Sequence, residues 1–218
     1  MNLLRSLADT LVPPTCVGCQ TPGAFWCSRC AKQLDLSIRP AVPGLSLVCA
    51  AGRYEGAVIR LIHAWKEDSA AVLDSALAPP LAMSIAAVMI TRELHRAVVV
   101  PIPSTPAASR RRQGEPLARL TGVACELLCS RQVDVELLHA LRTTRGRRDQ
   151  SELDIVQRSA NMQHAMTCVQ RPSGPVIVVD DIVTSGATLR EAHRALGPAT
   201  PISGYATVAA TPRRGPRG

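Results

Sequence analysis

Apolar residues recur along the chain with two periods, one typical of strands and one typical of helices. Short apolar or alternating runs predict strands at five places: 97–102, 133–137, 165–169, 176–179 and 202–209. Apolar positions spaced by three and four predict helices at three places: 58–66, 116–128 and from 189 onward. Because strands and helices alternate, the sequence predicts an α/β fold with a mostly parallel sheet.

One long uncharged segment, 75–91, approaches the length of a membrane span. It contains Pro79 and Pro80 and is rich in alanine, so we interpret it as a buried helix after a turn. Residues 1–12 are expected to form a short amphipathic helix, in which Arg5 and Asp9 interrupt the apolar run too early for a signal peptide. The expectation is a cytoplasmic protein without a membrane span.

Length and composition limit the domain organisation. A chain of 218 residues has room for one ordinary α/β domain and a small appendage. The expected parts are an N-terminal module at 1–40, a main domain at 47–210 and a disordered basic tail at 211–218, with a linker around 40–43. Aromatic residues make up only 2% of the chain, so the core should be aliphatic, and a base-stacking surface for single-stranded nucleic acid is disfavoured.

The net charge is +8, which suits a phosphorylated small molecule or a nucleic acid as partner. Much of the excess lies in three arginine clusters, at 110–112, 142–148 and 213–217. Solvated loops and a disordered end would account for such clusters equally well. Charge alone therefore leaves both kinds of partner open.

Four of the eight cysteines form two C-x-x-C pairs separated by seven residues: Cys16, Cys19, Cys27 and Cys30. Two such pairs let four thiolates converge on one Zn²⁺, at Zn–S distances near ~2.3 Å. A redox C-x-x-C is the alternative, but two pairs in one small loop argue against it. Four thiolate ligands leave no open coordination position, so a structural zinc is expected rather than a catalytic one. The other cysteines lack ligand-like spacing and are expected in the core.

The segment VIVVDDIVTSGATLREA, at 176–192, combines a strand with two acids and a hydroxyl-rich turn. Asp180 and Asp181 are expected to mark the exit of the strand, where an open parallel sheet presents groups to a crevice. The turn into the next helix can hold an anion, because backbone N–H groups and the helix dipole face outward there. Its members are Thr184, Ser185, Gly186, Ala187 and Thr188. The acids would then contact another part of the ligand, such as sugar hydroxyls or a Mg²⁺ ion shared with phosphates.

This DD-x-x-T-S-G-x-T stretch resembles the phosphoribosyl-pyrophosphate loop of type I phosphoribosyltransferases. With the four cysteines ahead of it, the chain from 3 to 210 resembles the ComF family, competence-associated proteins that join a zinc finger to a phosphoribosyltransferase domain. The resemblance implies a sheet of the type I phosphoribosyltransferase kind, with Asp180 and Asp181 holding the ribose hydroxyls and 184–188 cradling the 5-phosphate. It also implies Mg²⁺ and either phosphoribosyl pyrophosphate or ribose 5-phosphate as ligands.

The resemblance extends to the side of the site that would hold pyrophosphate. There the matching positions are Lys66, Ser104, Arg112, Gln150, Arg158 and Asn161. Arg145 belongs to the polar, Arg-rich segment 142–152, which suits a loop that closes over the site. The chain departs from the family directly after Arg112, where Gly-Phe-Asn-Gln is replaced by Gln-Gly-Glu-Pro, and again just beyond Lys66.

Two functions of different classes stay open. The first is an enzyme that transfers phosphoribosyl from the pyrophosphate donor to an amine or a base, by positioning and electrostatic stabilisation without a protein nucleophile. The second is a ligand-binding or scaffold module in DNA uptake, whose basic surface contacts DNA or a DNA-handling protein. A receiver-like phosphoacceptor fits poorly, because an anion-binding turn follows the acids directly. The sequence does not identify the acceptor.

Overall fold

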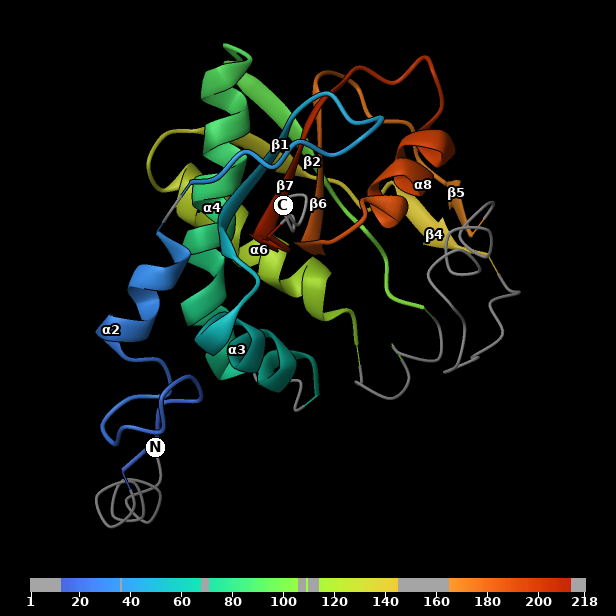
Figure 1. Cartoon of the computed structure of the whole chain (residues 1–218). Helices are drawn as coiled ribbons and strands as arrows, with labels where there is room; N and C mark the ends of the chain where they lie inside the picture. Colours follow the sequence, from blue (N-terminus) through green and yellow to red (C-terminus); the bar gives the residue numbers. More distant parts are fainter. Residues whose placement is uncertain are drawn as a thin grey trace, which may run out of the picture.

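The computed structural model describes residues 13–35, 37–67, 71–105, 109, 114–144 and 165–212 (Figure 1). The predicted helix at 1–12 and most of the predicted tail at 211–218 lie outside the described residues. The described residues form a mixed α/β fold preceded by a small four-cysteine module.

A five-stranded parallel sheet forms the centre of the fold. Its strands are, in spatial order, β1 (Val48–Arg53), β7 (Ile202–Ala210), β6 (Val176–Val183), β2 (Arg96–Pro101) and β3 (Asp134–Leu137). All neighbouring pairs are parallel. The central strands have continuous apolar runs because helices bury both of their faces. The predicted α/β fold with a mostly parallel sheet is confirmed.

Helices lie on both faces of the sheet (Figure 1). On one face, α4 (Asp74–Thr91) and α6 (Pro116–Cys129) pack against the strands and against each other. On the other face, α8 (Ala187–Leu196) lies near β6, beside a separate antiparallel pair formed by β4 (Leu141–Thr143) and β5 (Met166–Cys168). The helix α3 (Gly56–Glu67) follows β1, and a 3-10 turn, η2 (Ala71–Leu73), leads into α4.

The N-terminal module consists of turns, the short helix α2 (Ser28–Ala31) and the 3-10 turn η1 (Lys32–Leu34). Leu34 anchors it in the main core, where its side chain is 2% exposed. A Cβ atom at Gly52 in β1 would lie 2.3 Å from the Gln33 carbonyl oxygen, so the module and β1 approach as closely as their backbones allow.

One prediction about β6 is wrong. The strand does not end at Val179 but continues through Asp180 and Asp181 to Val183. Its pairing with β2 ends at Val179, whereas β7 continues beside it as far as Ala210. The acids therefore lie inside β6, at a stretch that is paired with β7 but no longer with β2.

Three further elements differ from the sequence analysis. Part of the segment predicted as a loop at 142–152 is strand β4, and β5 pairs with it in antiparallel fashion outside the main sheet. Strand β1 was not predicted at all. The helix α4 begins at Asp74, so Pro79 and Pro80 lie within it and no turn separates them from its remainder.

Among the described residues, one helical stretch, 71–91, is long and apolar enough to cross a membrane. Within it, 61% of the apolar window is buried inside the protein. Leu77, Leu81 and Ile85 are fully buried in the main core. This burial agrees with the predicted core helix.

Candidate functional site

The sulfur atoms of Cys16, Cys19, Cys27 and Cys30 come together in the N-terminal module, all within 4.8 Å of one another. Cys16 and Cys30 are buried, and the Cys27 N–H donates to the Cys16 sulfur at 3.4 Å. Tetrahedral Zn–S bonds of ~2.3 Å place sulfurs ~3.8 Å apart, so this cluster can hold a metal ion such as zinc.

The surroundings of these sulfurs shift the pKa values of two of the thiols in opposite directions. Hydrogen bonds with the Thr21 hydroxyl and then with the Arg29 guanidinium lower the pKa of the Cys19 thiol to about 5. Burial, followed by hydrogen bonds with the other thiols, raises the pKa of Cys30 to about 12. Without a metal the cluster would therefore mix thiols and thiolates, whereas a coordinated divalent cation deprotonates all four.

The module is fixed to α3. The Arg60 guanidinium donates two hydrogen bonds to the Gly18 carbonyl, one of them at 2.7 Å. A Cβ atom at Gly18 would lie 2.6 Å from the Trp26 ring and 2.9 Å from the Ala57 methyl group, so a larger residue does not fit. The last turn of α3 also carries Lys66. The module therefore packs on the helix that contributes this lysine to the predicted ligand site.

A cavity of about 320 Å³ opens at the carboxyl ends of β2 and β6; we call it the donor cavity. From β2 the chain crosses through α6 to β3 on one side, and from β6 it crosses through α8 to β7 on the other. Ligand crevices of open α/β sheets form where successive connections diverge in this way. Six of the predicted site residues line this cavity: Lys66, Ser104, Asp180, Asp181, Thr184 and Thr188.

The two acids are held close together in the donor cavity. The Asp181 N–H donates to the Asp180 carboxylate at 2.9 Å, and the Lys66 ammonium group forms an ion pair with the Asp181 carboxylate. Burial, and next the negative charge of Asp181, raise the pKa of Asp180 well above its usual value. Two carboxylates facing one lysine suit a cation or several hydroxyl donors at this position.

Gly186 forms the N-cap of α8, with a left-handed φ of 77°. A Cβ atom there would also lie 2.3 Å from Cγ1 of Val42, so both conformation and packing require glycine. Arg190 braces this turn by donating to the carbonyls of Pro43 and Ser185, each at 3.0 Å. The predicted anion-binding segment therefore contains a rigid turn, 184–186, and the start of α8, whose first N–H groups lack intrahelical partners.

Sequence reasoning missed a buried carboxylate that joins α3, the helix carrying Lys66, to two other helices. Asp74, which is 5% exposed, accepts hydrogen bonds from Trp65 Nε1 at 2.8 Å and from Arg119 Nε at 2.5 Å. Trp65 precedes Lys66 in α3, Asp74 begins α4 and Arg119 lies in α6, so one acid joins three helices. The available signal was an acid placed directly before a long uncharged segment, where the helix dipole favours it.

Four residues predicted for the pyrophosphate side lie outside the described residues: Arg112, Arg145, Gln150 and Arg158. Asn161 lies there as well. Their assignments stay predictions. Ser104 is described, and its N–H donates to the Glu115 carboxylate at 2.8 Å.

The chain matches no protein-family model and none of the curated proteins. Its function must therefore be inferred from the geometry of these two sites.

Proposed function

We propose that the donor cavity binds phosphoribosyl pyrophosphate, or ribose 5-phosphate, together with Mg²⁺, and that the protein transfers phosphoribosyl to an amine or a base. The supporting observation is that two carboxylates, a lysine and two residues of the predicted anion-binding segment, Thr184 and Thr188, line one cavity. Each of these suits a different part of such a donor. The proposal agrees with the resemblance of the 180–188 segment to type I phosphoribosyltransferases and of the whole chain to the ComF family.

Each group in the cavity has a chemical role in this proposal. The 5-phosphate accepts hydrogen bonds from N–H groups of the 184–188 segment, and the ribose hydroxyls donate to Asp180 and Asp181. Lys66 exchanges its pairing with Asp181 for the diphosphate oxygens of the donor. Mg²⁺, when bound, supplies positive charge that stabilises the leaving diphosphate, and carboxylate oxygens are suitable ligands for it. The residues of the chain thus position the donor and stabilise charge without a protein nucleophile.

The four-cysteine module has a structural role in the same proposal. We assign one zinc ion to Cys16, Cys19, Cys27 and Cys30, where four thiolates leave no position for a substrate. A phosphorylated sugar donor is a cytoplasmic metabolite, so the proposal also implies a cytoplasmic protein.

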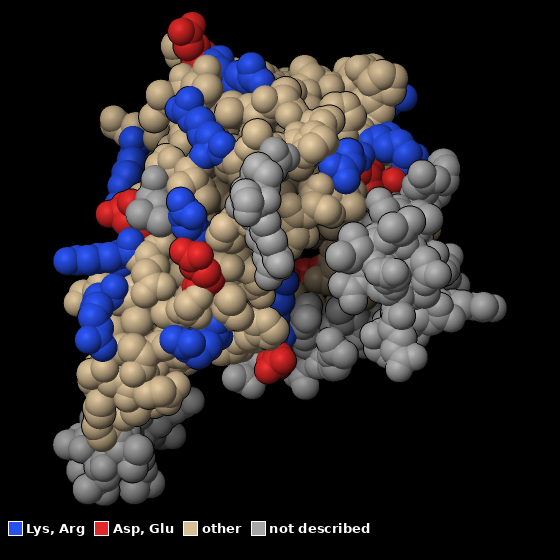
Figure 2. All heavy atoms as spheres, viewed as in Figure 1, with Lys and Arg blue, Asp and Glu red and all other residues tan. Residues whose placement is uncertain are grey.

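The alternative, a scaffold in DNA uptake that contacts DNA or a DNA-handling protein, has less support. Figure 2 shows Lys and Arg side chains of the described residues spread over one face, with uncharged surface between them. A nucleic-acid footprint is normally a continuous basic patch or stripe. On the part of this face that is described, the charge favours no such footprint.

Calorimetric titration with ribose 5-phosphate and Mg²⁺ tests the proposal. The wild type should bind saturably, and the Asp180→Asn, Asp181→Asn double variant should bind at least about 100-fold more weakly, because each acid contributes charged hydrogen bonds worth roughly 1.5–3 kcal/mol. The matched control is Asp134→Asn with Glu136→Gln, two exposed acids of β3. Equal affinities of the two double variants would contradict the proposal. Turnover assays with amines and bases then separate an enzyme from a binding module.

A further inference from the structure

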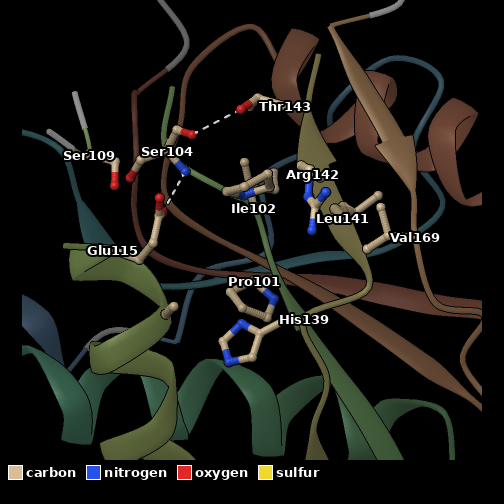
Figure 3. A pocket seen from close by; sticks show the side chains of 12 residues that line it. Pro101, Ile102, Ser104, Ser109, Glu115, His139, Leu141, Arg142, Thr143 and Val169 are labelled. Carbon is tan, nitrogen blue, oxygen red and sulfur yellow. Dashed lines mark hydrogen bonds between the residues drawn. The ribbon is translucent and has the colours of Figure 1, made fainter. Parts of the chain in front are cut away.

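A second cavity, of about 700 Å³, lies beside the donor cavity; we call it the side cavity. The two cavities share the segment that follows β2, Ile102, Pro103 and Ser104. Residues of β4 and Val169, which directly follows β5, also line the side cavity. The Thr143 hydroxyl donates to the Ser104 carbonyl at 3.3 Å (Figure 3). This hydrogen bond fixes β4 to the common wall. A small molecule in the side cavity would therefore lie next to the donor.

The walls of the side cavity are largely apolar. Pro101, Ile102 and Leu141 contribute buried groups, with Ile102 and Leu141 each 6% exposed. Val169 is 50% exposed, which is unusual for a branched apolar side chain beside a cavity. Apolar walls with few polar groups are typical of sites for small organic ligands, and a ring would cover these side chains.

The charged groups on the two sides of the side cavity differ in sign and in whether they already have a partner among the described residues. Figure 3 shows Glu115 near Ser104 on one side, Arg142 near Leu141 on the other, and His139 below them in this view. Glu115 is engaged, because it accepts the hydrogen bond from the Ser104 N–H. Within the described part of the chain, Arg142 forms no ion pair with a carboxylate. A guanidinium group beside apolar walls suits the acidic group of a ring compound.

We propose that the side cavity binds the acceptor, and that the acceptor is a flat ring compound with a carboxylate group. The carboxylate pairs with Arg142, the ring packs between Ile102, Leu141 and Val169, and the reacting nitrogen faces the donor cavity across Ser104. In the transfer, the lone pair of this nitrogen forms the bond to the anomeric carbon. The bond from that carbon to the diphosphate oxygen breaks, its electron pair leaves with the diphosphate, and the nitrogen releases a proton to water. This inference rests on the proposed function.

A chemical-shift titration of the ¹⁵N-labelled full-length protein with benzoate tests the inference. Benzamide carries the same ring without the charge, and cyclohexanecarboxylate carries the charge without a flat ring. Benzoate should shift the amide signals of Ile102, Leu141 and Thr143, and both other probes should bind more weakly. Arg142→Met should weaken benzoate binding about tenfold or more. Arg171→Met, an exposed arginine that does not line the cavity, should change it less than about twofold.

Equal weakening by the two arginine substitutions, or benzamide binding as tightly as benzoate, would overturn the inference. Unchanged signals away from the cavity establish that the Arg142→Met protein is folded. The same samples are titrated with ribose 5-phosphate and Mg²⁺. If the protein binds ribose 5-phosphate but not benzoate, the proposed function stands and the proposed acceptor site is wrong. If benzoate binds through Arg142 but ribose 5-phosphate does not bind, the side cavity is supported as a site for aromatic acids and the proposed donor site is contradicted.

Discussion

The four-cysteine module and the donor cavity both gather charged groups, but the chain builds them in opposite ways. The module takes all its candidate ligands from one short stretch, Cys16 to Cys30. Among the described residues, its small buried cluster consists of Cys16, Cys30 and Ala57 of α3. The donor cavity takes Lys66 from α3, Ser104 from the segment that follows β2, and its acids from β6. The comparison teaches that a local site with so small a core would need a bound ion for rigidity, whereas a site assembled from several elements is held rigid by the sheet.

The largest effect is expected from removing the metal ion that we propose for the four-cysteine module. Cys27→Ser, or chelation, should unfold residues 13–35 because a structural zinc contributes on the order of 10 kcal/mol to folding. Hydrogen exchange should show lost protection there and retained protection in β2 and β6. Cys129→Ser, an exposed cysteine outside the module, is the control. Loss of protection in β6 would show instead that the two regions fold as one unit.

The next effect concerns the carboxylate that joins three helices. Asp74→Asn should lower the free energy of unfolding by about 2 kcal/mol, less than for a fully buried ion pair because the Arg119 side chain is 37% exposed. Urea denaturation measures this change. Asp134→Asn removes an exposed acid that lies 4.0 Å from Arg96 and should cost less than about 0.5 kcal/mol. Similar values for both variants would mean that Asp74 does not stabilise the junction of the three helices.

A smaller effect is expected at the turn before α8. Gly186→Ala should cost about 1–2 kcal/mol through its φ of 77° alone, and the close contact of the new Cβ atom with Val42 adds to this cost. It should also weaken ribose 5-phosphate binding. Thermal unfolding and calorimetry measure the two changes. Gly122→Ala is the control. Gly122 lies within α6, and a Cβ atom there would lie 3.8 Å from Leu137, an ordinary van der Waals distance. An alanine at 186 without effect on ligand affinity would remove this turn from the phosphate site.

The smallest effect is expected at Asp180, where a substitution should raise stability rather than lower it. The pKa of Asp180 is raised in the folded protein, so between the unfolded pKa near 3.8 and the folded pKa the native state binds the additional proton. Wild-type stability should therefore fall as pH rises through this window. Asp180→Asn should flatten the dependence and slightly raise Tm at neutral pH, while ligand binding is weakened. A lower Tm would show that the charge of Asp180 does not destabilise the unliganded protein.

Local patterns predicted much of this molecule. The C-x-x-C spacing indicated the cysteine cluster, and the apolar runs indicated β2, β6, β7 and α6, because each signal lies within a few residues. The assignment of Gly186 to a tight turn followed from the same short stretch. These features depend on neighbours in sequence, which a single chain displays directly.

Features that depend on distant partners could not be predicted in this way. β6 extends past Asp180 because β7 continues beside it, and nothing in the acids themselves indicates a strand. β1 was missed because its residues are small to admit close neighbours, as Gly52 is beside Gln33, and small residues lack a strand pattern. The contacts of Asp74 with Trp65 and Arg119 likewise depend on how three helices meet.

The contact between Gly186 and Val42 determines where the chain can be divided for experiments. Val42 and Pro43 form the floor beneath the turn before α8, through packing and the Arg190 hydrogen bond. A shortened protein beginning at Leu47 would retain the sheet and both acids but lose this floor. One beginning at Ala31 would retain it, together with Leu34 in the core, and would lack all four clustered cysteines. A shortened protein should therefore begin near Ala31 rather than at Leu47, where the main domain was expected to begin.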